Sequence, residues 1–269
     1  MKPSIFTAFN KNIPFAEALV LIRRAGFEIV ALDPYLKYSG YDTPAGRLNI
    51  KRLMTENKLQ VDALHAPSPE GDRLFSLDES ERLESVRWCR VAMDLAALLD
   101  AGAVHLHLIS SCIADAELER KMIEQGRRSV AELSRHAVAL GIKLALENGK
   151  FQWYDRVLEL FLAEFGDPVG LCYDTGHANI KVGCFNLLEQ YAGRLQGFHI
   201  HDNDGQRDIH VLPYEGNTDW ERFRAIIKRF KFPHNLNLET RVSDSQFKNP
   251  EEFLAEARKR AERLMEHLF

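Results

Sequence analysis

The sequence predicts one α/β domain with the (β/α)8 TIM-barrel fold, extending over residues 1–269. Eight short apolar segments alternate with longer amphipathic ones, which is typical of parallel strands joined by helices. The length of 269 residues is close to the roughly 250 residues of a typical barrel. The turn after the first strand, FNKNIPF, lacks the glycine-rich phosphate loop that is common in doubly wound sheets.

Each expected strand is a short run of β-branched, aromatic or other apolar residues. In chain order the runs are SIFTAF (4–9), EIVALD (28–33), LQVDALHA (59–66), AVHLHLI (103–109), IKLALEN (142–148), VGLCYDT (169–175), LQGFHIHD (195–202) and NLNLET (235–240). Several of them alternate with period two. In IKLALE, Leu144 and Leu146 share one face and Glu147 lies on the other. The apolar face is expected to pack on helices, and the other face to point into the barrel.

Amphipathic segments between these runs predict helices with recognisable ends. The segments 14–26, 77–102 and 115–141 each end on glycine, as many helices do. The last segment, 249–269, begins with Asn249 as N-cap and Pro250 in the first turn. After the seventh strand, PYEGNTDW predicts the end of a loop and the start of a helix with Thr218 as N-cap.

Composition limits the classes of protein to consider. The net charge of −4 gives no electrostatic reason to expect binding to nucleic acid or to an anionic membrane. The four cysteines include no CxxC pair, and we expect them to be reduced. The N-terminus does not resemble a signal peptide, and no 18-residue apolar run occurs. We therefore expect a cytoplasmic protein.

Ionisable residues stand at the ends of six successive strand candidates. They are His65, His107, Glu147, Asp174, His201 and Glu239. In this fold the carboxyl ends of all strands meet at one rim, where active sites lie. One such residue alone is more often structural, but converging buried carboxylates and imidazoles need a compensating charge. Their chemistry suits Mn²⁺, Mg²⁺, Co²⁺ or Zn²⁺. The sequence therefore predicts a metal site.

These motifs resemble the xylose-isomerase-like TIM-barrel superfamily, which includes sugar isomerases and epimerases and the type-IV apurinic endonucleases. The resemblance rests on ALEN, CYDTGHA, FHIHDNDGQRDIH with PYEGNTDW, and NLET. In the isomerase and epimerase members, it implies one divalent ion held by Glu147, Asp174, His201 and Glu239, with the two glutamates also moving protons. His177 and Arg207 stand where such members bind substrate oxygens. His199 is expected to lie behind the ligands.

The endonuclease members hold three zinc ions, and their pattern also matches. It runs through His65, His107, Glu147, Asp174, His177, His201, Glu239 and the pair Asp208 and His210. Two departures weaken this match: the loop from His201 to Asp208 is shorter, and NGKFQWY replaces the expected run after Glu147. Asp208 and His210 therefore either bind a further ion or hold the loop over the substrate.

The main hypothesis from the sequence is a metal-dependent isomerase or epimerase of a small sugar, keto-acid or cyclitol derivative. The alternative is a multinuclear zinc phosphodiesterase of the endonuclease type. A barrel without activity is a third possibility, against which the intact ligand set argues. We expect a small carbohydrate-like substrate, no nucleic-acid or membrane partner, and a homodimer or tetramer, as is common among similar proteins. Phe151, Trp153 and Tyr154 either wall the pocket or pack structurally.

Overall fold

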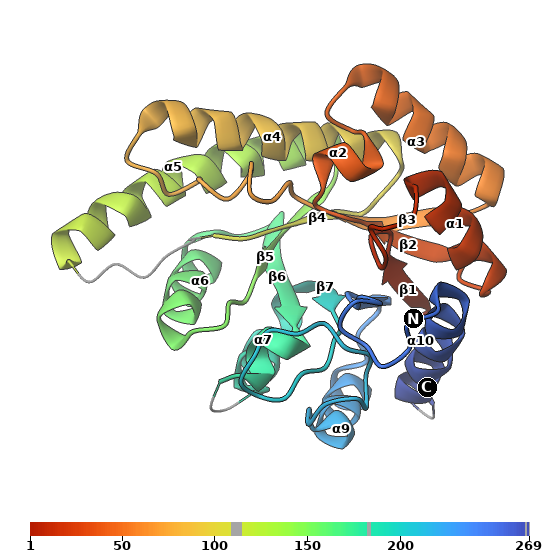
Figure 1. Ribbon diagram of the computed structural model, residues 1–269. Helices are drawn as coiled ribbons and strands as arrows, with labels where there is room; N and C mark the ends of the chain where they lie inside the picture. Colours follow the sequence, from red (N-terminus) through yellow and green to blue (C-terminus); the bar gives the residue numbers. More distant parts are fainter. Residues whose placement is uncertain (109–114, 182–183, 267, 269) are drawn as a thin grey trace.

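Eight parallel strands form a nearly closed barrel in the computed structural model, which describes residues 1–108, 115–181, 184–266 and 268 (Figure 1). The strands are β1 (Pro3–Phe6), β2 (Ile29–Leu32), β3 (Gln60–His65), β4 (Ala103–Leu106), β5 (Lys143–Glu147), β6 (Val169–Asp174), β7 (Leu195–His199) and β8 (Leu236–Leu238). The predicted TIM-barrel fold is confirmed.

Strand order follows the chain, running from β7 through β1 to β8. The last seam, between β7 and β8, is closed by a single parallel bridge between Ile200 and Leu238. There the Ile200 N–H donates to the carbonyl of Asn237 at 2.8 Å, and the Glu239 N–H donates to the carbonyl of Ile200 at 3.0 Å. Both bonds lie at the rim where the expected site residues gather.

Helices surround the strands on the outside (Figure 1). They are α1 (Phe15–Arg24), α2 (Leu36–Ser39), α3 (Pro44–Asn57), α4 (Glu79–Leu98), α5 (Ala116–Leu140), α6 (Gln152–Glu164), α7 (Thr175–Asn179), α8 (Asn186–Gln190), a 3₁₀ turn (Ala192–Arg194), α9 (Trp220–Phe230) and α10 (Pro250–Met265). None of the helices in these described ranges is long and apolar enough to cross a membrane. Asn249 caps α10 as predicted, accepting from the N–H groups of Glu251 and Glu252.

The strands are shorter than the runs predicted from sequence. β7 ends at His199 and β8 at Leu238, so His201 and Glu239 lie in the loops just beyond. β4 ends at Leu106, and the predicted ends at Ile109 and Phe269 lie outside the described residues. Regular strand pairing therefore ends at the rim, just before His201 and Glu239.

The prediction of Thr218 as N-cap is wrong by one residue. α9 begins at Trp220, and the side chain of Asp219 accepts from the N–H of Arg222 at 2.9 Å. Thr218 is held differently, because its N–H donates to Oδ1 of the buried Asp202 at 3.1 Å. The carboxylate of Asp202 thus fixes the residue before the cap.

Candidate functional site

Four strand-end side chains converge at the rim of the barrel. Glu147, Asp174 and His199 are the last residues of β5, β6 and β7, and Glu239 follows β8 directly. One ligand atom from each of the four lies within 4.8 Å of the others. Nδ1 of His199 is 3.1 Å from Oε2 of Glu147 and 2.9 Å from Oε2 of Glu239. We call these four residues the central cluster.

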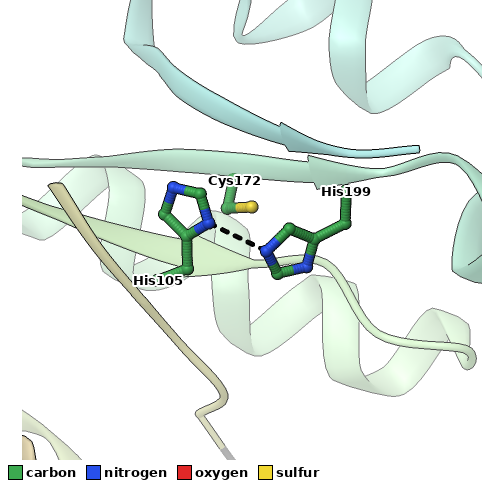
Figure 2. Close-up of side chains that lie close together, drawn as sticks. All are labelled: His105, Cys172 and His199. Carbon is green, nitrogen blue, oxygen red and sulfur yellow. Dashed lines mark hydrogen bonds between the residues drawn. The ribbon is translucent and has the colours of Figure 1, made fainter. Parts of the chain in front are cut away.

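The imidazole of His199 is oriented by a second buried histidine. Its Nε2 lies 2.8 Å from Nδ1 of His105, and the thiol of Cys172 lies close to both rings (Figure 2). The ring of His105 occupies the space over Gly197, where a Cβ atom would come within 2.5 Å of Nε2 of His105. With Nε2 of His199 engaged in this way, its Nδ1 faces the carboxylates. Nδ1 of His199 therefore lies beside the carboxylates of Glu147 and Glu239.

Three further histidines surround the carboxylate of Glu147. Nε2 of His65 and Nε2 of His107 lie 3.3 and 3.5 Å from its Oε2, and Nδ1 of His177 lies 3.3 Å from its Oε1. The other ring nitrogen of His107 is 3.1 Å from Oδ1 of Asp72, a residue that the sequence analysis did not single out. The structure thus brings all three expected histidines to the same glutamate.

A second group lies beside the central cluster. It consists of His201, Asp208 and His210, whose ligand atoms also lie within 4.8 Å of one another. The rings of His201 and His210 stack with centroids 4.0 Å apart. Nε2 of His201 is 3.1 Å from Oδ1 of Asp174, so Asp174 connects the two groups. Gly176 permits this approach, because a Cβ there would lie 1.9 Å from Cε1 of His201.

Two positively charged side chains contact this second group. Nζ of Lys150 lies 3.0 Å from Oδ2 of Asp208, and Nη2 of Arg241 donates to Nε2 of His210 at 3.2 Å. The sequence analysis missed both residues, although they follow the strand-end glutamates by three and two positions. Arg207 lies elsewhere: its side chain is 72% exposed and pairs with Asp204 at 2.7 Å.

The charges at the centre shift several pKa values. Burial alone would raise the pKa of Glu147, but the charges of His199 and His107 outweigh burial, and the pKa lies well below its usual range. The pKa of Glu239 is lowered too, since His199 and His210 outweigh burial. Both glutamates are therefore ionised at neutral pH.

Two histidines near Asp208, His177 and His210, have pKa values shifted in opposite directions. Burial lowers the pKa of His177, but Asp174, Asp208 and Glu147 outweigh it and raise the pKa to about 10. For His210, burial and the charge of His201 lower the pKa to about 4. His210 is therefore neutral at neutral pH, which agrees with its acceptance of a hydrogen bond from an arginine.

The central cluster has the features of a cation site. Oε2 of Glu147, Oδ2 of Asp174 and Nδ1 of His199 are buried and make no hydrogen bond in the described structure. Buried polar atoms without partners are costly unless a ligand satisfies them. Carboxylate oxygens and an imidazole nitrogen are ligands of Zn²⁺, Mn²⁺ and Co²⁺. The residues present fit one divalent ion.

A cavity of about 310 Å³ opens onto the cluster. Its walls include the aromatic residues Tyr35, Phe151, Trp153 and Tyr154, together with Glu147 and Glu239. The volume is near the lower end of the range for small-molecule pockets, roughly 300–1,000 Å³. Acidic and imidazole groups therefore lie beneath a small cavity at the rim of this TIM barrel. Active sites of TIM-barrel enzymes lie at this same end, where the carboxyl ends of the strands meet.

The chain belongs to the xylose isomerase-like TIM barrel family, whose model matches residues 19–267. It is 29% identical over 248 residues to an uncharacterized protein of Sinorhizobium fredii, covering 83% of this chain and 80% of the relative. It is 27% identical over 252 residues to fructoselysine 3-epimerase of Escherichia coli O157:H7, covering 85% of this chain and 86% of that enzyme.

Solved structures share the fold at lower identity. A D-tagatose 3-epimerase-like protein superposes with a TM-score of 0.80 at 20% identity, covering 98% of this chain and 99% of that one. D-allulose 3-epimerase from Methylomonas sp. in complex with D-allulose gives a TM-score of 0.79 at 16% identity, covering 98% and 96%. These likenesses extend over the whole barrel.

Proposed function

We propose that the protein is a divalent-metal-dependent epimerase or isomerase of a small sugar, keto-acid or cyclitol derivative. The observation that carries the proposal is the set of buried side-chain atoms on Glu147, Asp174 and His199 that converge without hydrogen bonds of their own and could each act as a metal ligand. The relative named fructoselysine 3-epimerase and the epimerases of the same fold support this reaction class. The small cavity fits a substrate of that size.

We assign the ion to Glu147, Asp174, His199 and Glu239. His199 replaces His201 of the set implied by resemblance, because its Nδ1 lies within 3.1 Å of two carboxylates. When bound, a divalent ion would polarise a substrate carbonyl and acidify the adjacent C–H bond.

The two glutamates are suited to moving the proton. Both line the cavity, where a carboxylate oxygen of either can accept a proton from carbon. One glutamate takes the proton, and the other returns it to the same carbon or to its neighbour. His177 also lines the cavity, and its raised pKa leaves it charged beside a developing oxyanion.

A metal assay combined with a substrate panel tests this proposal. The purified protein is stripped with chelator, reloaded with Mn²⁺, Co²⁺ or Zn²⁺, and assayed on ketoses and keto acids for stereochemical inversion or isomerisation. We expect about one tightly held ion per chain and ion-dependent turnover of one class of substrate. A protein that bound no divalent ion after reloading would rule the proposal out.

The second candidate function is a multinuclear zinc phosphodiesterase. The group of His201, Asp208 and His210 favours it, because these residues offer a second set of ligands. Against it, Lys150 and Arg241 contact Asp208 and His210 and supply positive charge there. Two or three zinc ions per chain, together with cleavage of DNA containing an abasic site, would support this candidate over the epimerase.

A further inference from the structure

Arg241 is a cavity-lining cation with few partners. It follows β8 and lines the cavity. Its backbone N–H donates to the carbonyl of His210 at 2.9 Å, and this bond holds the backbone from which the side chain extends. The guanidinium makes one hydrogen bond, to Nε2 of His210, and no ion pair with any carboxylate in the described ranges. Since a guanidinium offers five N–H donors, most of its capacity is unused.

Nearby carboxylates do not satisfy this charge. The charge of Arg241 contributes to lowering the pKa of Asp244. The oxygens of Asp244, however, accept hydrogen bonds from the N–H of His210 at 3.0 Å and from the hydroxyl of Ser243 at 2.8 Å. Asp208 is paired with Lys150 at 3.0 Å. Arg241 is thus positioned to contact a molecule that enters the cavity.

Some of the other arginines with little exposure pair with carboxylates, whereas the partly buried Arg194 donates to backbone carbonyls. Arg82 contacts Glu79 at 2.8 Å, and Arg260 contacts Glu256 at 2.9 Å. An unpaired charge is costly to remove from water, so its natural partner is an anion. The planar fork of arginine matches the two oxygens of a carboxylate or a phosphate.

We propose that Arg241 forms an anion-binding subsite, and that the substrate is a sugar derivative carrying a carboxylate or a phosphate. This inference rests on the proposed function, because it places the anionic group of the substrate in the same cavity as the central cluster. It narrows the substrate from neutral sugars to sugar acids and sugar phosphates.

Titration with simple anions tests the subsite directly. Wild type, Arg241→Met, Arg241→Lys and Arg207→Met are loaded with Mn²⁺, checked for equal ion content, and titrated calorimetrically with inorganic phosphate and, separately, with acetate. Loss of Arg241 is expected to weaken binding about 10- to 100-fold, as for a hydrogen-bonded charge. Arg241→Lys should retain part of the affinity. Preference for phosphate or for acetate indicates whether the substrate carries a phosphate or a carboxylate.

Several results would overturn this inference. They are no anion binding by wild type, equal binding by Arg241→Met, or a loss confined to Arg207→Met, whose side chain points to solvent. In a second arm, kcat/KM for matched ketoses with and without a terminal phosphate should fall at least about tenfold in Arg241→Met for the charged member only. An equal fall for both members would contradict the subsite. Absence of turnover in wild type counts against the proposed function alone, since the titration still decides the role of Arg241.

Discussion

Nδ1 of His199 lies 2.9 Å from Oε2 of Glu239 and 3.1 Å from Oε2 of Glu147. An imidazole nitrogen and a carboxylate oxygen at this distance are well placed to share a cation. His201, two residues further on, lies instead 3.1 Å from Asp174 and stacks on His210. The two histidines of the HIH motif therefore occupy different groups of the rim.

Exchanging each histidine for alanine separates these roles. His199→Ala is expected to weaken Mn²⁺ or Zn²⁺ binding by at least about 100-fold, more than the loss of a supporting residue usually costs. His201→Ala should have a smaller effect on the central ion. Competition with a chelating dye measures both affinities. If His201→Ala lost the ion and His199→Ala kept it, the ligand set implied by family resemblance would be the correct one.

The proton-transfer role predicts large losses for amide substitutions. Glu147→Gln and Glu239→Gln, each saturated with Mn²⁺, are expected to lose about 10²- to 10⁴-fold in kcat on the substrate found in the panel. Exchange of deuterium from solvent into the reacting carbon should fall with it. Glu221→Gln, with a side chain 76% exposed on α9, is the control. Near-normal turnover by either cavity variant would exclude the two-carboxylate shuttle.

His105 is expected to act by fixing the orientation of His199. His105→Leu removes the partner 2.8 Å from Nε2 of His199, and ion affinity should fall about 10- to 100-fold. Asparagine can place an acceptor near the former Nδ1 position, so His105→Asn should recover much of the affinity. The visible spectrum of the Co²⁺ form reports the ligand geometry. Equal affinities in both variants would show that the hydrogen bond does not matter.

Asp33, directly after β2, gives a prediction about the pH dependence of stability. Burial raises its pKa to about 6, although Thr7 and the Tyr35 N–H donate to it. The folded state therefore holds this proton more tightly than the unfolded state. The stabilising contribution is complete below about pH 4 and is lost as the pH rises through about 6, amounting to about 3 kcal/mol at 1.4 kcal/mol per pH unit.

Comparison of unfolding free energies checks this contribution. Between pH 4 and pH 7, wild type should lose stability relative to Asp33→Asn, which carries no titrating carboxyl at that position. Urea unfolding across this range measures the difference, with Asp42→Asn as an exposed control. A difference independent of pH would show that Asp33 titrates alike in both states.

Asp202 is expected to be the main support of the loop after β7. Its two oxygens accept from the N–H groups of Asn203, Thr218, Tyr214 and Gly216 and from Nε1 of Trp220. Asp202→Ala leaves these donors without partners and should lower the free energy of unfolding by roughly 3 kcal/mol or more. Denaturant unfolding measures the loss. A change below about 0.5 kcal/mol would mean that water replaces the carboxylate.

The sequence was sufficient for the barrel because strand and helix patterns alternate along the whole chain. The period-two pattern also placed Glu147 and Glu239 on the inner face. It could not decide between His199 and His201, because both lie on that face and only the point where β7 ends separates them. Lys150 and Arg241 were missed for a related reason: loop residues have no periodicity that indicates direction.

Residues on both sides of the seam between β7 and β8 contribute to the central cluster, since His199 ends β7 and Glu239 follows β8. One bridged pair closes the sheet there, and its hydrogen bonds involve Ile200, which stands between the two histidines, and the N–H of Glu239. A cation bound by His199 on one side of this seam and by Glu239 on the other would link the two strands where a single bridged pair joins them. Binding of the ion would then stabilise the closed barrel as well as supply its chemistry. The substrate would bind at a rim that the ion already holds together.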